Sequence, residues 1–199
     1  MFDVARALRR WVRQTGADRI AELTDADHAL LTDAIDVSAW YSYDQYLRLI
    51  DAAFKRSCNG DWQQLHALCA AGFARACERG YDRLLRRGDR VRAFAAVSVL
   101  WRASHDFGSA VAYTDPWGTT ISVTHYPGVG ELAGNVNAGW FLGVAQHIGV
   151  EVERVELRRR PWVGEGDEQV IRLHWREVDC DALDRDSRRD SDSNPCLAS

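Results

Sequence analysis

The stretch SAVAYTDPWGTTISVTHY, residues 109–126, decides the fold, because here the spacing of apolar residues changes from helical to strand-like. Val, Thr, Ile and Tyr are frequent on both sides of the turn Asp115-Pro116-Trp117-Gly118. β-Branched and aromatic residues favour extended chain, and Pro and Gly mark the turn that separates the two runs. The stretch predicts a β-hairpin that follows a helical first half.

Apolar residues recur at helical spacing throughout the chain before this hairpin. The spacing predicts helices near residues 2–14, 46–54, 65–76 and 90–104, with one or two short helices between the first two. Ser42 and Gln45 have the spacing of a capping box at the start of the second. In the last helix the row that faces the core is Val91, Phe94, Ala95, Ser98 and Trp101.

Beyond the hairpin, residues 131–148 have helical spacing, and strand-like composition resumes at 150–158 and 170–178. The predicted fold class is α+β: an N-terminal helical layer packed on an antiparallel sheet of about four strands, with one helix inserted between the two strand pairs. We expect one domain over residues 1–178. Residues 179–199 consist mostly of Asp, Arg and Ser and predict a disordered polar tail.

Composition excludes several classes of protein. Apolar residues make up 46% and charged residues 27% of the chain, as in ordinary globular proteins. The net charge is -4, Lys55 is the single lysine, and the arginines alternate with acidic residues, which argues against nucleic-acid binding. The five cysteines include no CxxC pair, and no apolar run reaches membrane-spanning length. We expect a cytoplasmic protein without integral membrane association.

Four landmarks in a fixed order carry a resemblance to a known family. They are Trp40-Tyr41 before a helix, Trp101 before a hairpin that follows Asp106-Phe107-Gly108, residues 138–142 (AGWFL) in the later helix, and a closing strand at 170–175. In this order the chain resembles a myxobacterial family of short proteins of unknown function. That family is related to the ligand-binding domain shared by nitric-oxide signalling, vinyl-reductase-type and TRAPP Golgi transport proteins.

The resemblance implies a helical layer against an antiparallel sheet, in a domain that binds a hydrophobic small molecule or a partner subunit. Many members of the wider group carry cysteines in the last two strands. Residues 156–175 contain none here, and Gln169 stands about where one is expected. A thiol or metal site is therefore not carried over, and fold alone does not transfer a function.

Motifs of catalysis are absent from the sequence. The six histidines have neither HExxH nor HxH spacing, and there is no GxSxG and no Gly-rich phosphate loop. In the pair His105-Asp106 a carboxylate can orient an imidazole, and hydrogen bonding at a helix end explains the pair equally well. We expect no catalytic and no metal-ligating residues, and the sequence leaves any cofactor undetermined.

A ligand pocket is predicted beside two tryptophans, because Trp101 and Trp140 continue the inward rows of their helices. Small neighbours leave room near these rings. The predicted ligand-binding residues are Trp101, Trp140, Ser98, Phe94 and Gly143. The alternative is that Gly143 serves close packing of helices and no pocket exists.

Three functions follow from these observations, in order of preference. The first is a noncatalytic small-molecule-binding or regulatory domain in bacterial signalling, with a hydrophobic pocket between helices and sheet. The second is a TRAPP-like scaffold that docks another protein without a ligand, and the third is a small enzyme. The expected partners are a hydrophobic small molecule and a second copy of the chain or a related subunit, since exposed tryptophans such as Trp117 are typical of interfaces.

Overall fold

The structure is a computed structural model of the chain, and it describes residues 2–15, 20–32, 41–77, 84–85, 88–126 and 130–176, with side chains from residue 5 onward. The predicted tail at 179–199 lies outside these ranges, and so do Trp40, Cys180 and Cys196. No helix in the described ranges is long and apolar enough to cross a bilayer.

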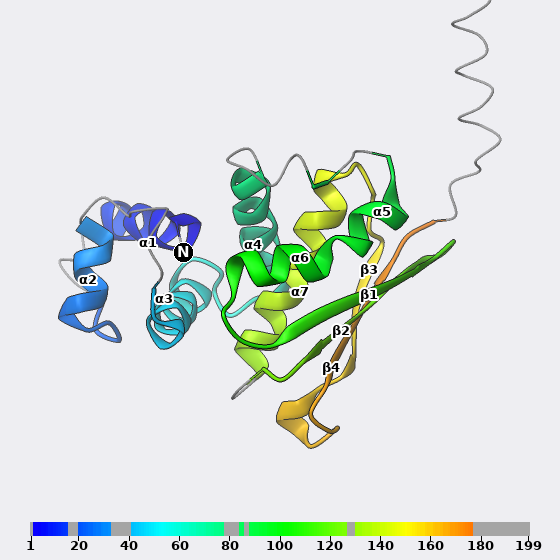
Figure 1. The fold of residues 1–199 in the computed structure, drawn as a ribbon. Helices are drawn as coiled ribbons and strands as arrows, with labels where there is room; N and C mark the ends of the chain where they lie inside the picture. The colour runs from blue at the N-terminus through cyan, green and yellow to red at the C-terminus, as the bar shows by residue number, and fades with distance from the viewer. Residues whose placement is uncertain are drawn as a thin grey trace, which may run out of the picture.

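Four strands form one antiparallel sheet in the order β1-β2-β4-β3. They are β1 (Ser109–Asp115), β2 (Gly118–Thr124), β3 (Arg154–Arg159) and β4 (Gln169–His174). Helix α7 (Glu131–His147) separates the two strand pairs along the chain, and β2 pairs with β4 to join them. The predicted α+β fold class is confirmed, and Figure 1 shows the sheet with helices over one of its faces.

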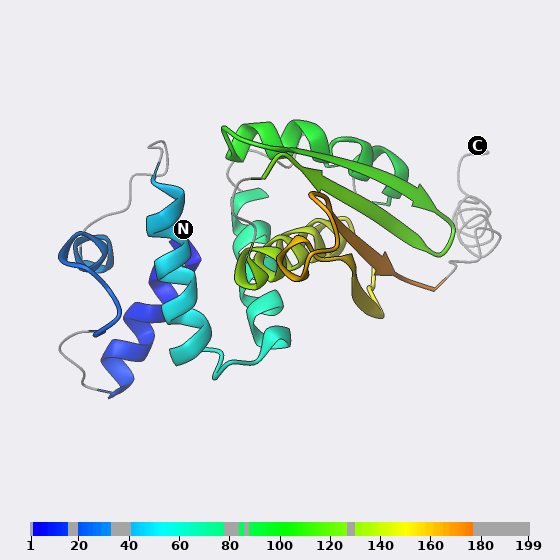
Figure 2. The same ribbon diagram turned by 90° about the horizontal axis from the view of Figure 1, so that it is seen from below.

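The other helices come before the sheet in the sequence. They are α1 (Phe2–Thr15), α2 (Asp25–Thr32), α3 (Tyr43–Arg56), α4 (Trp62–Ala76), α5 (Arg90–Ala95) and α6 (Val97–Ser104). Figure 2 shows α1, α2 and α3 set apart from the sheet, on the far side of α4 and α7. The apolar core accordingly divides into one cluster among the first helices and a second between α4–α7 and the sheet.

Two local predictions about the helices are wrong. The segment 90–104 is not one helix, because it breaks at Ala96 into α5 and α6. Val91, on the predicted inward row, is 67% exposed on α5. Ser42 does precede α3 as its N-cap, but its side chain makes no capping hydrogen bond. Gln45 reaches away from the helix start and donates to the carbonyl of Ala26 at 3.3 Å.

The hairpin turn is tied to the end of β4. Trp175 donates its indole Nε1–H to the carbonyl of Pro116 at 3.0 Å, and its backbone N–H donates to Trp117 at 3.1 Å. Gly118 permits this approach, because a Cβ atom there would lie 2.2 Å from the carbonyl oxygen of Leu173. The close contact fixes the Trp175 ring relative to the sheet.

Candidate functional site

The two tryptophans of the predicted pocket do lie together. Trp101 on α6 is 1% exposed and donates its Nε1–H to the carbonyl of Phe107 at 3.0 Å. The Trp101 ring lies 6.4 Å from that of Trp140 and 6.2 Å from that of Phe141, both on α7. Aromatic side chains therefore pack against one another where the sequence predicted a ligand.

The other three predicted residues lie in different surroundings. Phe94 is buried and stacks on Trp175 at 5.8 Å, while Ser98 is half-buried on the first turn of α6. Gly143 faces α4, where a Cβ atom would be 2.7 Å from the Cβ of Phe73 and 2.9 Å from the Cα of Ala70. Its surroundings are those of close helix packing, the alternative that the sequence left open.

His105 belongs to the same aromatic cluster and is not paired with Asp106. Its ring stacks on Trp101 at 4.0 Å, and Nδ1 lies 3.2 Å from the hydroxyl of Ser104 and 3.3 Å from the carbonyl of Trp101. Burial lowers the pKa of His105 to about 4, so the ring is neutral at pH 7. Asp106 is exposed. The pair does not form the carboxylate–imidazole contact of an acid–base catalyst.

Sequence reasoning missed two polar links buried in the core. Tyr126 donates its phenolic O–H to the Tyr43 hydroxyl, which connects the chain after β2 to α3. On α7, Asn137 donates to Gln169 at 2.9 Å, and Gln169 donates to the carbonyl of Gly134 at 2.8 Å. Asparagines among the apolar residues of a helix were the available signal, because buried amides need partners. Gln169, where the resemblance led us to expect a cysteine, thus joins β4 to α7.

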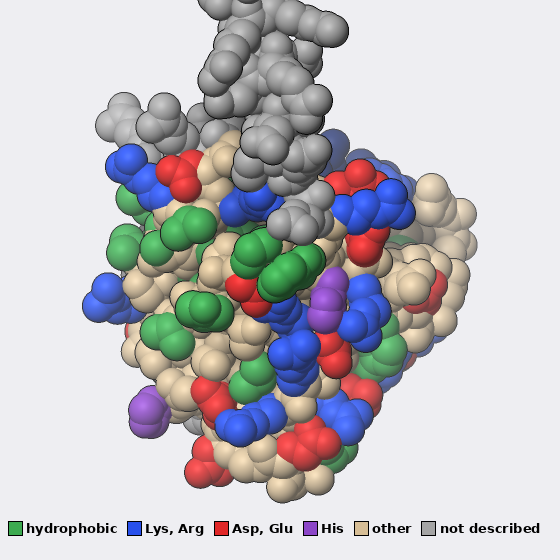
Figure 3. Space-filling model, turned by 90° about the vertical axis from the view of Figure 1, so that its right-hand side faces the viewer, with side chains coloured by type: hydrophobic (Ala, Val, Ile, Leu, Met, Phe, Trp, Pro, Cys, Tyr) green, Lys and Arg blue, Asp and Glu red, His purple; other side chains and the backbone are tan. Residues whose placement is uncertain are grey.

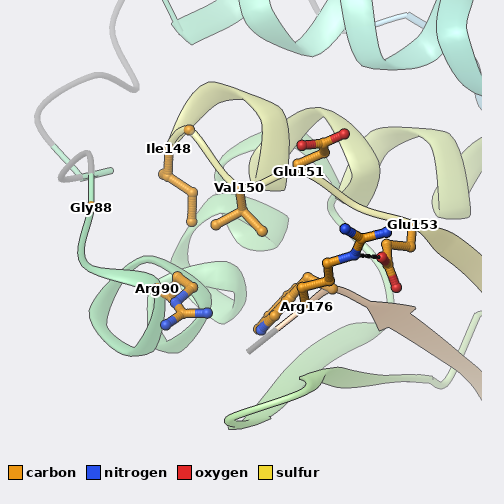
Figure 4. Close-up of a pocket in the computed structure, with 9 residues that line it drawn as sticks. Gly88, Arg90, Ile148, Val150, Glu151, Glu153 and Arg176 are labelled. Atoms are coloured by element: carbon orange, nitrogen blue, oxygen red, sulfur yellow. Dashed lines mark hydrogen bonds and ion pairs between the residues drawn. The ribbon is translucent and has the colours of Figure 1, made fainter. Parts of the chain in front are cut away.

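A half-open cleft of about 610 Å³ lies between the start of α5, the end of α7 and the chain beyond β4 (Figure 4). Ile148, Val150 and Trp175 give it an apolar wall, and charged side chains stand around them. The described residues that line it are Gly88, Arg90, Ile148, Gly149, Val150, Glu151, Glu153, Trp175 and Arg176. None belongs to the predicted site, although Phe94 of that site touches the cleft wall through Trp175.

One arginine in the cleft lacks an anionic partner among the described residues. Arg176 forms an ion pair with Glu153 on one side of the cleft (Figure 4). Arg90 lies with its guanidinium carbon 5.7 Å from the centre of the Trp175 ring, and its Nη1 is buried without a hydrogen-bond partner in the described part of the chain. The cleft thus combines apolar surface with one guanidinium that has no anionic partner in the described part of the chain.

The outer face of the sheet carries a second group of exposed side chains. Val111, Tyr113 and Trp117 are 60%, 72% and 59% exposed along β1 and its turn. Beside them Glu156 accepts from His174 at 2.7 Å, and Arg172 pairs with Asp115 at 2.8 Å. Figure 3 shows hydrophobic side chains next to such a band of mixed charge. Within the described ranges, no group of three or more His, Cys, Asp or Glu residues is placed to hold a metal ion.

No protein-family model matches the chain, and no curated protein matches it. Several solved structures do match the chain. An H-NOX protein from Shewanella oneidensis in the Fe(II)NO state is 13% identical with a TM-score of 0.59, and the match covers 87% of this chain and 98% of that one. An NMR structure of a mutant H-NOX domain from the same organism, in the Fe(II)CO state, is 14% identical with a TM-score of 0.61, over 88% and 98%.

A third match comes from a study of heme distortion in the H-NOX family, at 10% identity and a TM-score of 0.52, over 98% of this chain and 89% of that one. Such low identities carry information on architecture and none on the ligand. The fold of this chain is that of the H-NOX domains.

Proposed function

We propose that the chain is a noncatalytic small-molecule-sensing domain of a signalling system, and that its ligand binds in the cleft between α5, α7 and the end of β4. The observation that carries this proposal is Arg90, which has no anionic partner within the described ranges and lies beside the apolar wall of Trp175 and Ile148. Concave sites with apolar walls and few polar groups are typical of ligand pockets. The H-NOX fold, found in proteins whose structures were solved in Fe(II)NO and Fe(II)CO ligation states, supports a sensory role.

Heme is the cofactor named for one of the similar structures, and the residues that line the cleft do not fit it. Heme iron is held by an axial His, Cys, Met or Tyr, and no described residue lining the cleft is of these types. His105 is neutral as an iron ligand must be, but its ring is stacked on Trp101 and contacts Phe107 and Tyr126 edge-on. An organic ligand agrees better with the site.

The absence of catalysis is part of the same proposal. His105, the candidate acid–base residue, lies among aromatic rings and is not one of the residues that line the cleft. The carboxylate of Glu153 is engaged by Arg176, so a polarised pair of proton donor and acceptor is not assembled in the described part of the cleft. Binding is the activity that this arrangement supports.

Native mass spectrometry of the purified full chain tests the proposal. We expect a small organic molecule to remain bound, and we expect Val150→Phe, which places a ring in the cleft, to release it. Val99→Phe is the matched control, because Val99 is 44% exposed on α6. Hemin added to the protein should keep the absorption spectrum of free hemin. A molecule that stays on the Val150→Phe protein, or a heme spectrum typical of axial ligation, would contradict the proposal.

A second candidate function is docking, and the exposed Val111, Tyr113 and Trp117 favour it. Exposed aromatic residues on one face are typical of interaction surfaces, and the occupant we propose is a second copy of the chain. Sedimentation at micromolar concentration should then show two chains, and Tyr113→Ser with Trp117→Ser should give a monomer. A wild-type chain that remains monomeric at high concentration would remove this candidate.

A further inference from the structure

We propose that the cleft selects a singly charged organic anion with an apolar body. Its carboxylate would pair with the guanidinium of Arg90, and its body would lie against Trp175, Ile148 and Val150. This inference rests on the proposed function, namely that the cleft holds a small molecule. It goes further because it assigns the chemical class of the ligand and the residue that recognises its charge.

Arg90 is the anchor because its surroundings leave its charge unmatched. The neighbouring carboxylate of Asp89 caps α5 by accepting from the backbone N–H of Arg92 at 3.0 Å. Among the described residues Arg90 forms no salt bridge, and its Nη1 is buried without an acceptor. A buried donor without a partner carries a desolvation penalty, which an anionic acceptor in the cleft would remove.

Trp175 supplies a rigid apolar wall. Its ring is 3% exposed, is held by the hydrogen bond from Nε1 to Pro116, and stacks on Phe94. Ile148 at the end of α7 is 2% exposed and lines the same cleft. Because these side chains are fixed by packing, a ligand would meet them without having to order them.

The charges that line the cleft argue for a single negative charge on the ligand. Two arginines and two glutamates are present, and Arg176 and Glu153 neutralise each other. Arg90 is left on one side, and Glu151 lies on the other side of the cleft in Figure 4. A polyanion such as a nucleoside triphosphate would place its further charges near Glu151, and a cation would face Arg90.

The size of the cleft argues for an apolar body larger than that of acetate. Its volume of about 610 Å³ falls within the usual range of small-molecule sites. A carboxylate alone would fill only the region beside Arg90 and leave the wall of Ile148 and Val150 in water. A fatty or aromatic acid of moderate size uses both features.

Isothermal titration of the full chain with decanoate and naphthoate tests the inference, with decanamide, naphthamide and ATP as comparison probes. We expect both acids to bind, each amide to bind at least about tenfold more weakly, and ATP to bind no better than the amides. A lost charge-assisted hydrogen bond is of this size. Arg90→Met should weaken the acids about tenfold or more and leave the amides unchanged, while Arg90→Lys should retain part of the affinity.

Arg92→Met is the matched control, because Arg92 is exposed on the same helix and does not line the cleft. Thermal melts of each variant confirm that it is folded. If the amides bind as tightly as the acids, if ATP binds more tightly, or if Arg90→Met and Arg92→Met behave alike, the ligand class is wrong while a binding cleft remains. If no probe binds and no molecule copurifies with the chain, the proposed function itself fails.

Discussion

At the scale of single residues, the contact of Gly143 with α4 leaves no room for a side chain. The nearest atoms to an added Cβ include the Cα and carbonyl oxygen of Ala70, both at 2.9 Å, and backbone atoms cannot rotate away. We expect Gly143→Leu to lower the free energy of unfolding by about 1–3 kcal/mol, as overpacking does. Urea denaturation measures it.

Gly130 provides the control for this substitution, since a Cβ atom there would meet nothing within 4 Å. Gly130 is also the N-cap of α7, where serine is well accepted, so Gly130→Ser should leave stability within about 0.5 kcal/mol of wild type. A Gly143→Leu protein as stable as Gly130→Ser would show that space is open beside α7 and would restore the pocket predicted near Trp140.

The buried carboxylate of Asp27 is expected to make the stability of the fold depend on pH. Its carboxylate is 0% exposed and accepts from Arg48 at 2.8 and 3.0 Å and from the Thr24 hydroxyl at 2.8 Å. The hydrogen bond from Arg48 is the largest influence, and it lowers the pKa of Asp27 below the usual value. Because the folded-state pKa is depressed, its contribution to stability is present above roughly pH 4 and is lost as pH falls toward the folded-state pKa.

Asp27→Asn should therefore lower the melting temperature at pH 7, and its difference from wild type should narrow below roughly pH 4. Asp51→Asn is the control, because Asp51 pairs with Lys55 on the surface of α3. Thermal melts across pH measure both variants. A difference between wild type and Asp27→Asn that stays constant down to the lowest pH would contradict the assigned ion pair.

Residue-level reasoning from the sequence found a pair of inward-facing tryptophans and missed the residues of the cleft, for a physical reason. Trp101 and Trp140 were found because each continues an apolar row on its own helix, and a periodic pattern reports burial. Arg90 and Trp175 come from the start of one helix and the end of the last strand. These two side chains lie close together only because segments far apart in the chain pack against each other, and no local sequence pattern indicates such packing.

At the scale of elements, the link between α3 and the end of β2 depends on two phenols. Tyr43 and Tyr126 share a hydrogen bond, and burial raises the pKa of Tyr43 to about 12. We expect Tyr43→Phe to lower the free energy of unfolding by about 1 kcal/mol, since Tyr126 loses a buried partner.

Tyr113→Phe is the matched control, because Tyr113 is 72% exposed, and it should change stability by less than about 0.5 kcal/mol. Chemical denaturation of both variants gives the comparison. Equal stabilities for Tyr43→Phe and Tyr113→Phe would mean that this hydrogen bond does not hold α3 against the segment that follows β2.

The elements themselves were largely predictable, with errors where local patterns carry no signal. The hairpin was predicted because Val, Ile and Thr flank a turn, and its strands β1 and β2 lie within the expected stretch. The break at Ala96 was missed, since alanine favours helix and nothing in the sequence there indicates a break. Strand β3 starts at Arg154, four residues after the predicted start, and Val150 and Val152 pack against the core before the strand begins.

At the scale of the whole molecule, two apolar clusters are joined chiefly where α4 packs on α7. The cleft lies at the far end of α7, away from α1–α3, and borders both helices and sheet. The sequence predicted this layering and a ligand between the layers. It placed the ligand at the aromatic cluster of Trp101, whereas the structure offers an open cleft at the end of α7.

Ligand binding in the cleft is tested most directly by titrating the isotope-labelled full chain with decanoate and recording the indole N–H region of a two-dimensional NMR spectrum. Tryptophan-to-phenylalanine variants assign the signals. We expect a saturable shift of the Trp175 signal, with those of Trp101 and Trp117 unchanged, because Trp175 alone of these three lines the cleft. A shift confined to Trp101 and Trp140, or no shift in any indole signal at saturating decanoate, would contradict it.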